Sequence, residues 1–315
     1  MAGFFSLNVL QTALEVGLIY GLVALALFIS FSILNIADLS TDGCFTLGCA
    51  VGAMLTIAGH PILALFAAMA AGVLSGYVTA FLQTRLGVES ILAGIIVNTA
   101  LYTINLAVMG FSSNVSIFGR DTVFTLTRGL LGDSPTSRIL VLAALLAVVC
   151  ILLIRFFGTT LGLSIRATGD SPDMVSASSI NPKLTITVGL CLSNSLTALS
   201  GCLIGQYNKT CDINLGTGMV TIALASLIIG EVFAGKKGGV ARRVFCVVLG
   251  SIVYRFIIAI ALRLNISTEY FKLVSAVIVA VAIATPRVRE RAKLERIKSM
   301  SRRMRAERKE GAADA

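Results

Sequence analysis

Residues 161–181 read LGLSIRATGDSPDMVSASSIN, a polar segment that separates the apolar stretches 138–157 and 183–206. The flanking stretches are each long enough for a membrane-spanning helix, which needs about 20 apolar residues. The segment opens with a turn that contains Gly162, followed by Arg166. This pattern predicts a polar connection between two spans.

The centre of this segment carries a helix-start signal. Ser171 can cap a helix, Pro172 suits the first helical position, and Asp173 favours the positive end of the helix dipole. A short helix is predicted over 173–179, where Asn181-Pro182 closes it. Such a helix between two spans could press on a soluble partner at the membrane surface. The alternative is an ordinary surface loop.

The composition is that of a multi-spanning membrane protein. Of 315 residues, 56% are hydrophobic and 13% charged, and the mean hydropathy is +0.91. A soluble domain of this size could not bury so much apolar surface. We therefore predict an all-α polytopic membrane domain of about nine helices over 1–286 and a basic tail over 287–315. The apolar stretches are 11–34, 43–58, 61–84, 90–109, 138–157, 183–206, 218–234, 240–263 and 270–286.

The second stretch is short and follows the polar segment 35–43 (NIADLSTDG). A non-helical polar segment is tolerated at membrane depth only where it lines a cavity or is buried in protein. We therefore predict a broken helix near 35–58. A cytoplasmic loop followed by a short span is the alternative.

The basic residues predict the orientation. The tail after Pro286 contains eleven Lys and Arg residues, and the positive-inside rule places it in the cytoplasm. Counting back through nine spans puts the N-terminus outside and the 159–182 connection inside. The tail is expected to follow anionic lipid, where each basic residue contributes about 1 kcal/mol; docking on a partner is the alternative. The net charge of +10 follows membrane topology and gives no indication of nucleic acid binding.

No enzyme site is recognisable. The segment 230–237 (GEVFAGKK) nearly matches a phosphate-binding loop, but Lys237 replaces the hydroxyl that would hold magnesium, and the segment ends a span. There is one histidine, His60, and no Ser/His/Asp or HExxH set. We expect a chain without catalytic residues, metal site, cofactor or nucleotide site of its own.

Polar side chains within the predicted spans can serve as helix–helix contacts or line a polar path. Each is costly in lipid, so it should face protein or water. The residues are Glu15, Asn98, Asn105, Asn194, Gln206, Glu231 and Arg255.

Two motifs carry a family resemblance. Residues 162–174 (GLSIRATGDSPDM) with Ile180-Asn181 resemble the cytoplasmic coupling motif of ABC importer permeases of the branched-chain amino acid and ribose type. Residues 33–43 (ILNIADLSTDG) resemble a second signature of that family. More narrowly, the chain is similar to tryptophan/tyrosine ABC transporter permeases, in segments 30–48, 90–95, 189–206 and 225–231.

The resemblance implies a permease subunit in the bacterial plasma membrane that moves a small polar solute: an amino acid, with an aromatic amino acid as the narrower expectation. It implies two copies of an ABC ATPase that binds the ATP, an extracytoplasmic solute-binding protein and a permease homodimer. The coupling residues it implies are Arg166, Gly169, Asp170, Ser171, Pro172, Asp173 and Met174.

The residues of the break suggest a translocation path. The amide groups at a helix start near Gly43 could meet a solute's carboxylate or hydroxyl, and Asp38 or Asp42 its ammonium. In the competing interpretation, both Asp residues cap the helix at the inner surface. The path residues are Asn35, Asp38, Ser40, Thr41, Asp42, Asn98, Asn194 and Glu231.

The rival function is an ion-coupled secondary transporter. Interrupted helices and buried carboxylates such as Asp38 and Glu231 would suit it. A membrane enzyme is disfavoured by the missing catalytic groups. Transport that depends on an ATPase would favour the importer, and transport driven by an ion gradient alone would favour the rival.

Overall fold

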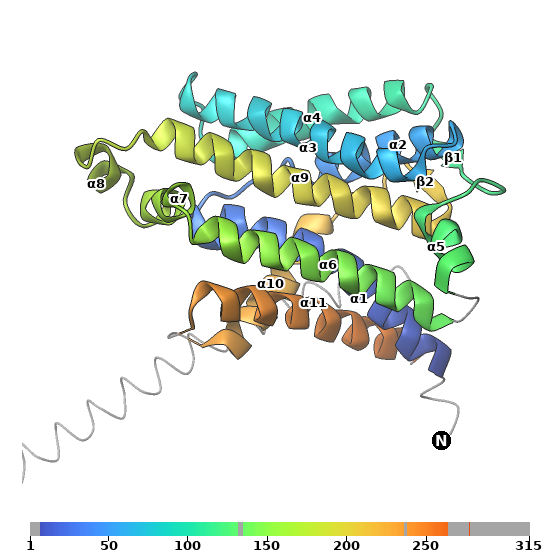
Figure 1. The fold of residues 1–315 in the computed structure, drawn as a ribbon. Helices are drawn as coiled ribbons and strands as arrows, with labels where there is room; N and C mark the ends of the chain where they lie inside the picture. Colours follow the sequence, from blue (N-terminus) through green and yellow to red (C-terminus); the bar gives the residue numbers. More distant parts are fainter. Residues whose placement is uncertain (1–6, 132–134, 236–237, 264–276, 278–315) are drawn as a thin grey trace, which may run out of the picture.

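The apolar stretches fold into a bundle of α-helices (Figure 1). The computed structural model describes residues 7–131, 135–235, 238–263 and 277. Within these ranges six helices are long and apolar enough to cross a membrane, and two shorter apolar helices accompany them. The predicted all-α, multi-spanning fold is confirmed. The ninth predicted stretch, apart from Val277, and the basic tail lie outside the described residues.

The elements follow the predicted stretches closely, with a few short additions. In chain order they are α1 (Leu7–Leu27), η1 (Phe28–Ile33, a π-helical continuation of α1), α2 (Thr41–Ile57), α3 (Pro61–Thr84), α4 (Ser90–Val108), β1 (Asn114–Ser116), α5 (Val123–Leu131), α6 (Pro135–Phe157), α7 (Thr160–Asp170), α8 (Pro172–Ala177), α9 (Pro182–Asn208), β2 (Thr210–Asp212), α10 (Met219–Ala234) and α11 (Val240–Arg263).

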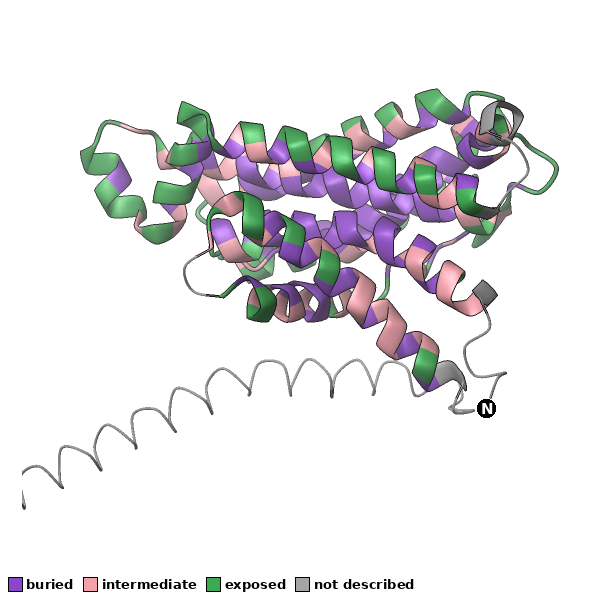
Figure 2. Ribbon diagram, turned by 60° about the horizontal axis from the view of Figure 1, so that its bottom comes forward, coloured by how far each residue is buried: buried purple, intermediate pink, exposed green. Residues whose placement is uncertain are grey.

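Helix α9 forms the centre of the bundle and packs against α1, α2 and α3. In α9, 83% of the most apolar window is buried inside the protein, against 22% for α6. Small residues permit this close packing: a Cβ at Gly48 of α2 would overlap the backbone of Ala198, and a Cβ at Gly72 of α3 would overlap the backbone of Asn194. Figure 2 shows the buried residues along the centre and the exposed ones on the outward faces.

The predicted interruption of the second span is present. Residues 34–40 are not helical, and α2 begins at Thr41. The Cys44 thiol, in the first turn of α2, donates to the backbone oxygen of Asn194 at 3.3 Å. Asn194 lies twelve residues, or about 18 Å at 1.5 Å per residue, along α9 from Pro182. Helix α2 therefore starts near the mid-length of α9, deep in the bundle.

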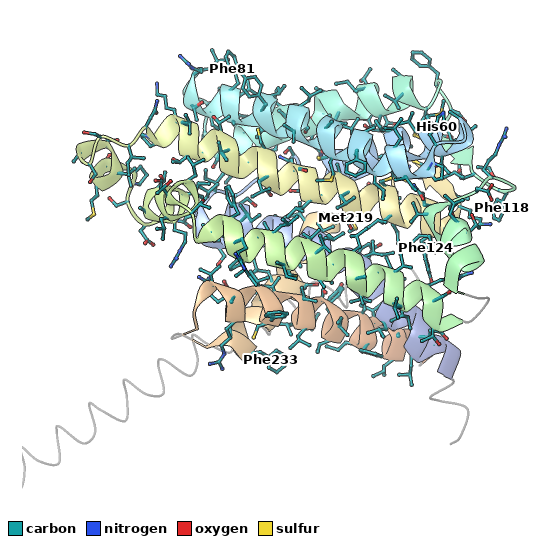
Figure 3. All side chains as sticks on the ribbon, viewed as in Figure 1. His60, Phe81, Phe118, Phe124, Met219 and Phe233 are labelled. Atoms are coloured by element: carbon teal, nitrogen blue, oxygen red, sulfur yellow. The ribbon has the colours of Figure 1, made fainter. Side chains whose placement is uncertain are left out.

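Helix α10 is the second short helix, and it also begins in the interior. Residues 213–218 connect β2 to α10 and pass the start of α2, where a Cβ at Gly216 would overlap the backbone oxygen of Asp42. Met219, the first residue of α10, is 2% exposed and lies within the bundle, whereas Phe81 and Phe233 point outward (Figure 3).

The connections differ from the sequence prediction in two places. The turn expected at the start of the polar segment is instead helix α7, because Thr159 caps it: the Gly162 amide donates to Thr159 Oγ1 at 3.3 Å. The short helix that follows, α8, ends at Ala177 rather than Ser179. At the opposite end, β1 pairs antiparallel with β2. No pattern in the sequence predicts these strands, which are three residues each.

Candidate functional site

The break between η1 and α2 is closed by hydrogen bonds to Asp38. The Ser40 amide and hydroxyl both donate to Asp38 Oδ1, at 2.8 and 2.6 Å. Asn194 Nδ2 donates to Asp38 Oδ2 at 3.0 Å. Asp38 is 2% exposed and Asn194 is fully buried, so the carboxylate joins the break to the middle of α9.

Helix α3 adds two hydroxyls to this cluster. Thr79 Oγ1 donates to Ser40 Oγ at 3.4 Å. The buried Ser75 Oγ and Asn194 Oδ1 have no hydrogen-bond partner among the described residues. A buried polar atom without a partner is uncommon and costs free energy. Both atoms could therefore form an additional hydrogen bond, and both lie beside the break.

Asp42 joins the starts of the two short helices. Its Oδ2 accepts from the Gly218 amide and its Oδ1 from the Val220 amide, both at 2.9 Å. Thr46 Oγ1, one turn further along α2, accepts from the Gly216 amide at 3.1 Å. The Gly216, Gly218 and Val220 amides at the start of α10 thus have protein acceptors, at positions that are buried or half-buried.

This arrangement bears on both interpretations of the acidic residues. Asp38 accepts a hydrogen bond at the start of α2, as the capping interpretation expects. This start lies at the mid-length of α9, however, and not at the inner surface. The Asp42 carboxylate accepts from an amide at the start of α10 instead of capping its own helix. Helix α2 begins at Thr41, two residues before the predicted start at Gly43. In this conformation the amides of Ser40, Gly218 and Val220 are bonded to these two carboxylates.

The remaining predicted path residues are more widely distributed. Asn98 is half-buried on α4, where a Cβ at Gly43 would lie 2.7 Å from its Oδ1. Asn35 is exposed near the N-terminal end of the break. Glu231 lies apart from Asp38, near the end of α10, where its carboxylate pairs with Arg243 at 2.8 Å. The fold therefore brings together Asp38, Ser40, Thr41 and Asn194, with Asp42 and Asn98 beside them.

Two other polar residues of the spans make contacts between helices. Gln206 accepts from the Val123 amide at 2.9 Å and donates to the Pro61 oxygen at 3.1 Å. Glu15 accepts from the Tyr207 hydroxyl at 2.7 Å. Within the described ranges no group of three or more His, Cys, Asp or Glu residues could hold a metal ion.

The predicted coupling segment forms two short helices at one end of the bundle (Figure 1). Ser171 caps α8, with the Met174 amide 3.4 Å from its Oγ. Val175 is buried and anchors α8, whereas Met174 is 71% exposed. Arg166, Asp170, Pro172 and Asp173 are exposed as well.

Helix α7 connects this surface to the interior. Gly169 is half-buried against η1, and a Cβ there would overlap the Ile33 carbonyl oxygen. The preceding residue, Thr168, shares a hydroxyl–hydroxyl hydrogen bond of 2.8 Å with Thr185, which ties α7 to α9. The coupling segment is therefore in backbone contact with the helix that leads into the break.

Sequence reasoning missed Ser75, Thr79, Ser32 and Arg243. Ser75 and Thr79 are four residues apart in a run of small residues, which puts them on one helix face. That spacing was an available signal. Ser32 and Arg243 are joined to Glu231 across different helices, and no local pattern announces such a contact.

Comparisons with a family model and with curated proteins both place this chain among transport permeases. Residues 9–283 match the family model described as "Branched-chain amino acid transport system / permease component". The chain is 33% identical to the "Tyrosine transport system permease protein" of Clostridioides difficile (strain R20291) over 269 residues, covering 85% of this chain and 88% of that protein. It is 30% identical to an uncharacterized protein of Rickettsia prowazekii (strain Madrid E) over 282 residues, covering 89% and 98%. No solved structure gives a significant match.

The bonds at Asp42 predict the effect of its replacement. Asp42→Ala leaves the half-buried Gly218 and Val220 amides without these acceptors, and a typical intramolecular hydrogen bond contributes about 0.5–1.5 kcal/mol to stability. The purified variant should unfold at a lower temperature and exchange its amide hydrogens faster at 218–222. Asp42→Asn keeps one carbonyl oxygen and should lose less.

The exposed Asp121 provides the matched control, because surface replacements usually change stability by no more than about 0.5 kcal/mol. Asp121→Ala should unfold like the unmodified protein. An Asp42→Ala variant with unchanged unfolding temperature and unchanged exchange would show that the carboxylate does not hold the two helix starts together.

Proposed function

The chain belongs to the family of branched-chain amino acid transport permeases, and from that membership we propose that it is the membrane subunit of an ATP-driven amino acid importer. The observation that carries the proposal is the exposed, capped helix α8, which projects at one end of the bundle and is connected through α7 to the interior break. A separate ABC ATPase would bind α8 and supply the energy.

The number of partners follows from the single coupling segment. One chain supplies one α7–α8 pair, so two copies of the permease would be needed to engage two ATPase subunits. A permease homodimer, two ATPase subunits and an extracytoplasmic solute-binding protein make up the proposed assembly. Arg166, Gly169, Asp170, Ser171, Pro172, Asp173 and Met174 form the proposed coupling surface.

The distribution of basic residues supports an orientation in the bacterial plasma membrane. Arg85, Arg155 and Lys183 flank helices at the end of the bundle that carries α7 and α8. Under the positive-inside rule this end is cytoplasmic, with the N-terminus outside and the C-terminus inside. The basic tail after Pro286 would then meet the inner lipid surface.

The chemistry of the break supports a small zwitterionic solute. Hydroxyls, amides and two carboxylates surround it, and no dense ring of one charge is present among the described residues. Asn194 Oδ1 could accept from an ammonium group, and Ser75 Oγ could donate to a carboxylate. We propose that an amino acid passes this cluster when the helices separate, and the C. difficile relative supports an aromatic one, tyrosine.

The proposal is tested by uptake into vesicles that contain the permease, its ATPase and its binding protein. We expect ATP-dependent uptake of labelled tyrosine or tryptophan, in preference to leucine, ribose and a nucleoside. Preference for the sugar or the nucleoside would remove the amino acid and keep the importer. Uptake by the purified permease in ATP-free vesicles, driven by an ion gradient, would instead establish the secondary transporter.

The exposure of Met174 predicts its role in coupling. Met174→Glu places a charge on an apolar contact, so less ATPase should co-purify with the permease, and transport should fall with it. Met174→Leu keeps an apolar side chain and is the control. Ser171→Ala removes the α8 cap, worth about 1 kcal/mol of helix stability, and should weaken the same association more mildly. Equal ATPase recovery from all four proteins would exclude α8 as the docking helix.

The proposed path predicts state-dependent access to the break. Single cysteines at Ser40 and Thr41, in a variant without the seven native cysteines, should react with a polar thiol reagent in one stage of the transport cycle. Ser193→Cys is the control, because Ser193 donates to the Ala26 oxygen between α9 and α1 and should stay protected. Absence of labelling at 40 and 41 in every stage would remove this segment from the path.

A further inference from the structure

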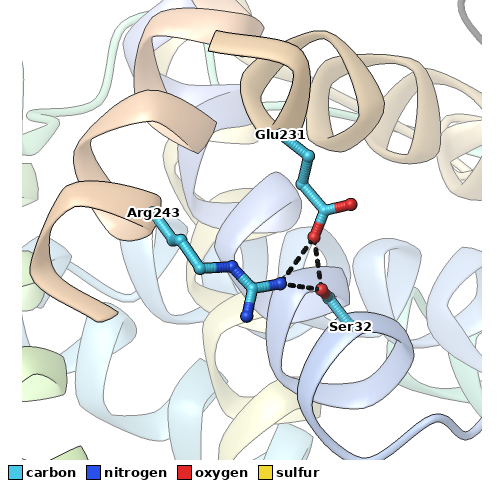
Figure 4. Close-up of polar contacts among 3 residues, drawn as sticks. All are labelled: Ser32, Glu231 and Arg243. Carbon is cyan, nitrogen blue, oxygen red and sulfur yellow. Dashed lines mark hydrogen bonds and ion pairs between the residues drawn. The ribbon is translucent and has the colours of Figure 1, made fainter. Parts of the chain in front are cut away.

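Ser32, Glu231 and Arg243 meet in a polar cluster (Figure 4), near the ends of η1 and α10 and the start of α11, at the end of the bundle where Figure 1 places α7 and α8. They come from η1, α10 and α11, and we call them the η1 cluster. Arg243 Nη2 donates to Ser32 Oγ at 2.6 Å and to Glu231 Oε1 at 2.8 Å. Ser32 Oγ also donates to Glu231 Oε1. The cluster therefore ties the end of α1 to the α10–α11 pair.

Arg243 holds the π-helical segment at a second point. Its guanidinium lies over the Phe28 ring, 5.0 Å from the centroid, one turn before Ser32. The segment that contains both residues, η1, has the hydrogen bonding of a π-helix: the Leu34 amide donates to the Ile29 oxygen, five residues back, at 3.0 Å. Short π-helical segments are rare and occur frequently at functional sites.

Another part of the same segment carries the contact with α7. Gly169 meets the Ile33 carbonyl oxygen and the Leu34 Cα directly, with no side chain between the two backbones. A close-packed interior transmits a displacement because it compresses little. Movement of α7 would therefore displace η1, and with it the residues that the η1 cluster holds.

Helix α10 is bound near both of its ends. Near its last turn Glu231 joins the η1 cluster, and at its first turn the amides are bonded to Asp42 of α2. A displacement of η1 that moves Glu231 would therefore shift the start of α10 against the start of α2. These starts lie beside the proposed path.

We propose that Ser32, Glu231 and Arg243 are positioning residues that carry movement of α7 to α10, and through Asp42 to the start of α2. The role of this movement in transport rests on the proposed function. The mechanical link itself, by which movement of α7 displaces α10, does not depend on it. The Glu231 and Arg243 side chains are 38% and 32% exposed, so water screens their attraction and it contributes little to stability. Their replacement should therefore disturb coupling more than folding.

The mechanical link is tested on the purified permease alone, by hydrogen–deuterium exchange. Gly169→Val should displace η1 and change exchange in α10 (219–234) by about two- to thirtyfold, the range found for residues along coupled networks. The same substitution combined with Arg243→Met should change exchange in η1 but no longer in α10. Arg242→Met is the matched control, because Arg242 is the exposed neighbour, and in that background the effect on α10 should persist.

If the Gly169→Val variant does not fold, the same link can be tested in the opposite direction. Coupling is reciprocal, so Arg243→Met alone should change exchange in α7 (160–170), and Arg242→Met should not. An effect of Gly169→Val on α10 that survives Arg243→Met would overturn the proposal. So would an α7 that does not respond to Arg243→Met.

The transport role is tested in the assembled importer. Glu231→Arg and Arg243→Glu should each lower the solute moved per ATP hydrolysed, and the double exchange should restore it. The role in transport would be rejected if the Glu231→Arg/Arg243→Glu double variant did not restore transport while the hydrogen–deuterium exchange results were as expected. If the unmodified assembly shows no ATP-dependent uptake, the proposed function fails, and the exchange experiment still decides the mechanical link.

Discussion

Helices α2 and α10 begin within a largely apolar bundle, where the free amides of a helix start need hydrogen-bond acceptors. Asp38 and Asp42 supply acceptors at these two starts. Asp38 accepts from Ser40 and Asn194, and Asp42 accepts from the first amides of α10. Because each carboxylate also joins two separate segments, the bonds that satisfy the helix starts fix the position of α2 against α9 and α10. The rest of the interior is arranged around these two junctions.

The same constraint explains the small residues along α9 and its neighbours. Hydrogen bonds between the break and α9 require the helix backbones to approach closely, and Gly48, Gly72 and Gly201 permit it where a Cβ would overlap a backbone oxygen. Lipid supplies little hydrophobic drive for helix association, so close packing and interhelical hydrogen bonds contribute most. The interhelical hydrogen bonds of the polar cluster therefore depend on the small residues that let the helices approach.

The interior junctions and the surface helix α8 are linked by short contacts. Gly169 meets η1, η1 ends at the break, and the η1 cluster joins it to α10. In the proposed importer, the surface that the ATPase would contact has to be connected to the proposed path. The described contacts provide a continuous one, and it passes through hydrogen bonds and backbone contacts that have defined partners.

Local patterns in the sequence determined the helices, because a helix satisfies its backbone within itself and its apolar stretch is contiguous. They also determined the break at 35–40, where polar residues interrupt the pattern, and the Ser171-Pro172 start of α8. The motifs in 162–174 and 33–43 indicate the family without any knowledge of tertiary contacts. Of the predicted path residues, the fold gathers Asp38, Ser40, Thr41 and Asn194 and places Glu231 elsewhere.

Only the tertiary structure decided which groups meet. Asp42 bonds to an amide 176 positions away, and Ser32 to a carboxylate 199 positions away. Such contacts depend on the depth and register at which helices pack, and these are set by shape along their whole length. No local pattern encodes them, since the same Asp42 would equally suit a cap on its own helix.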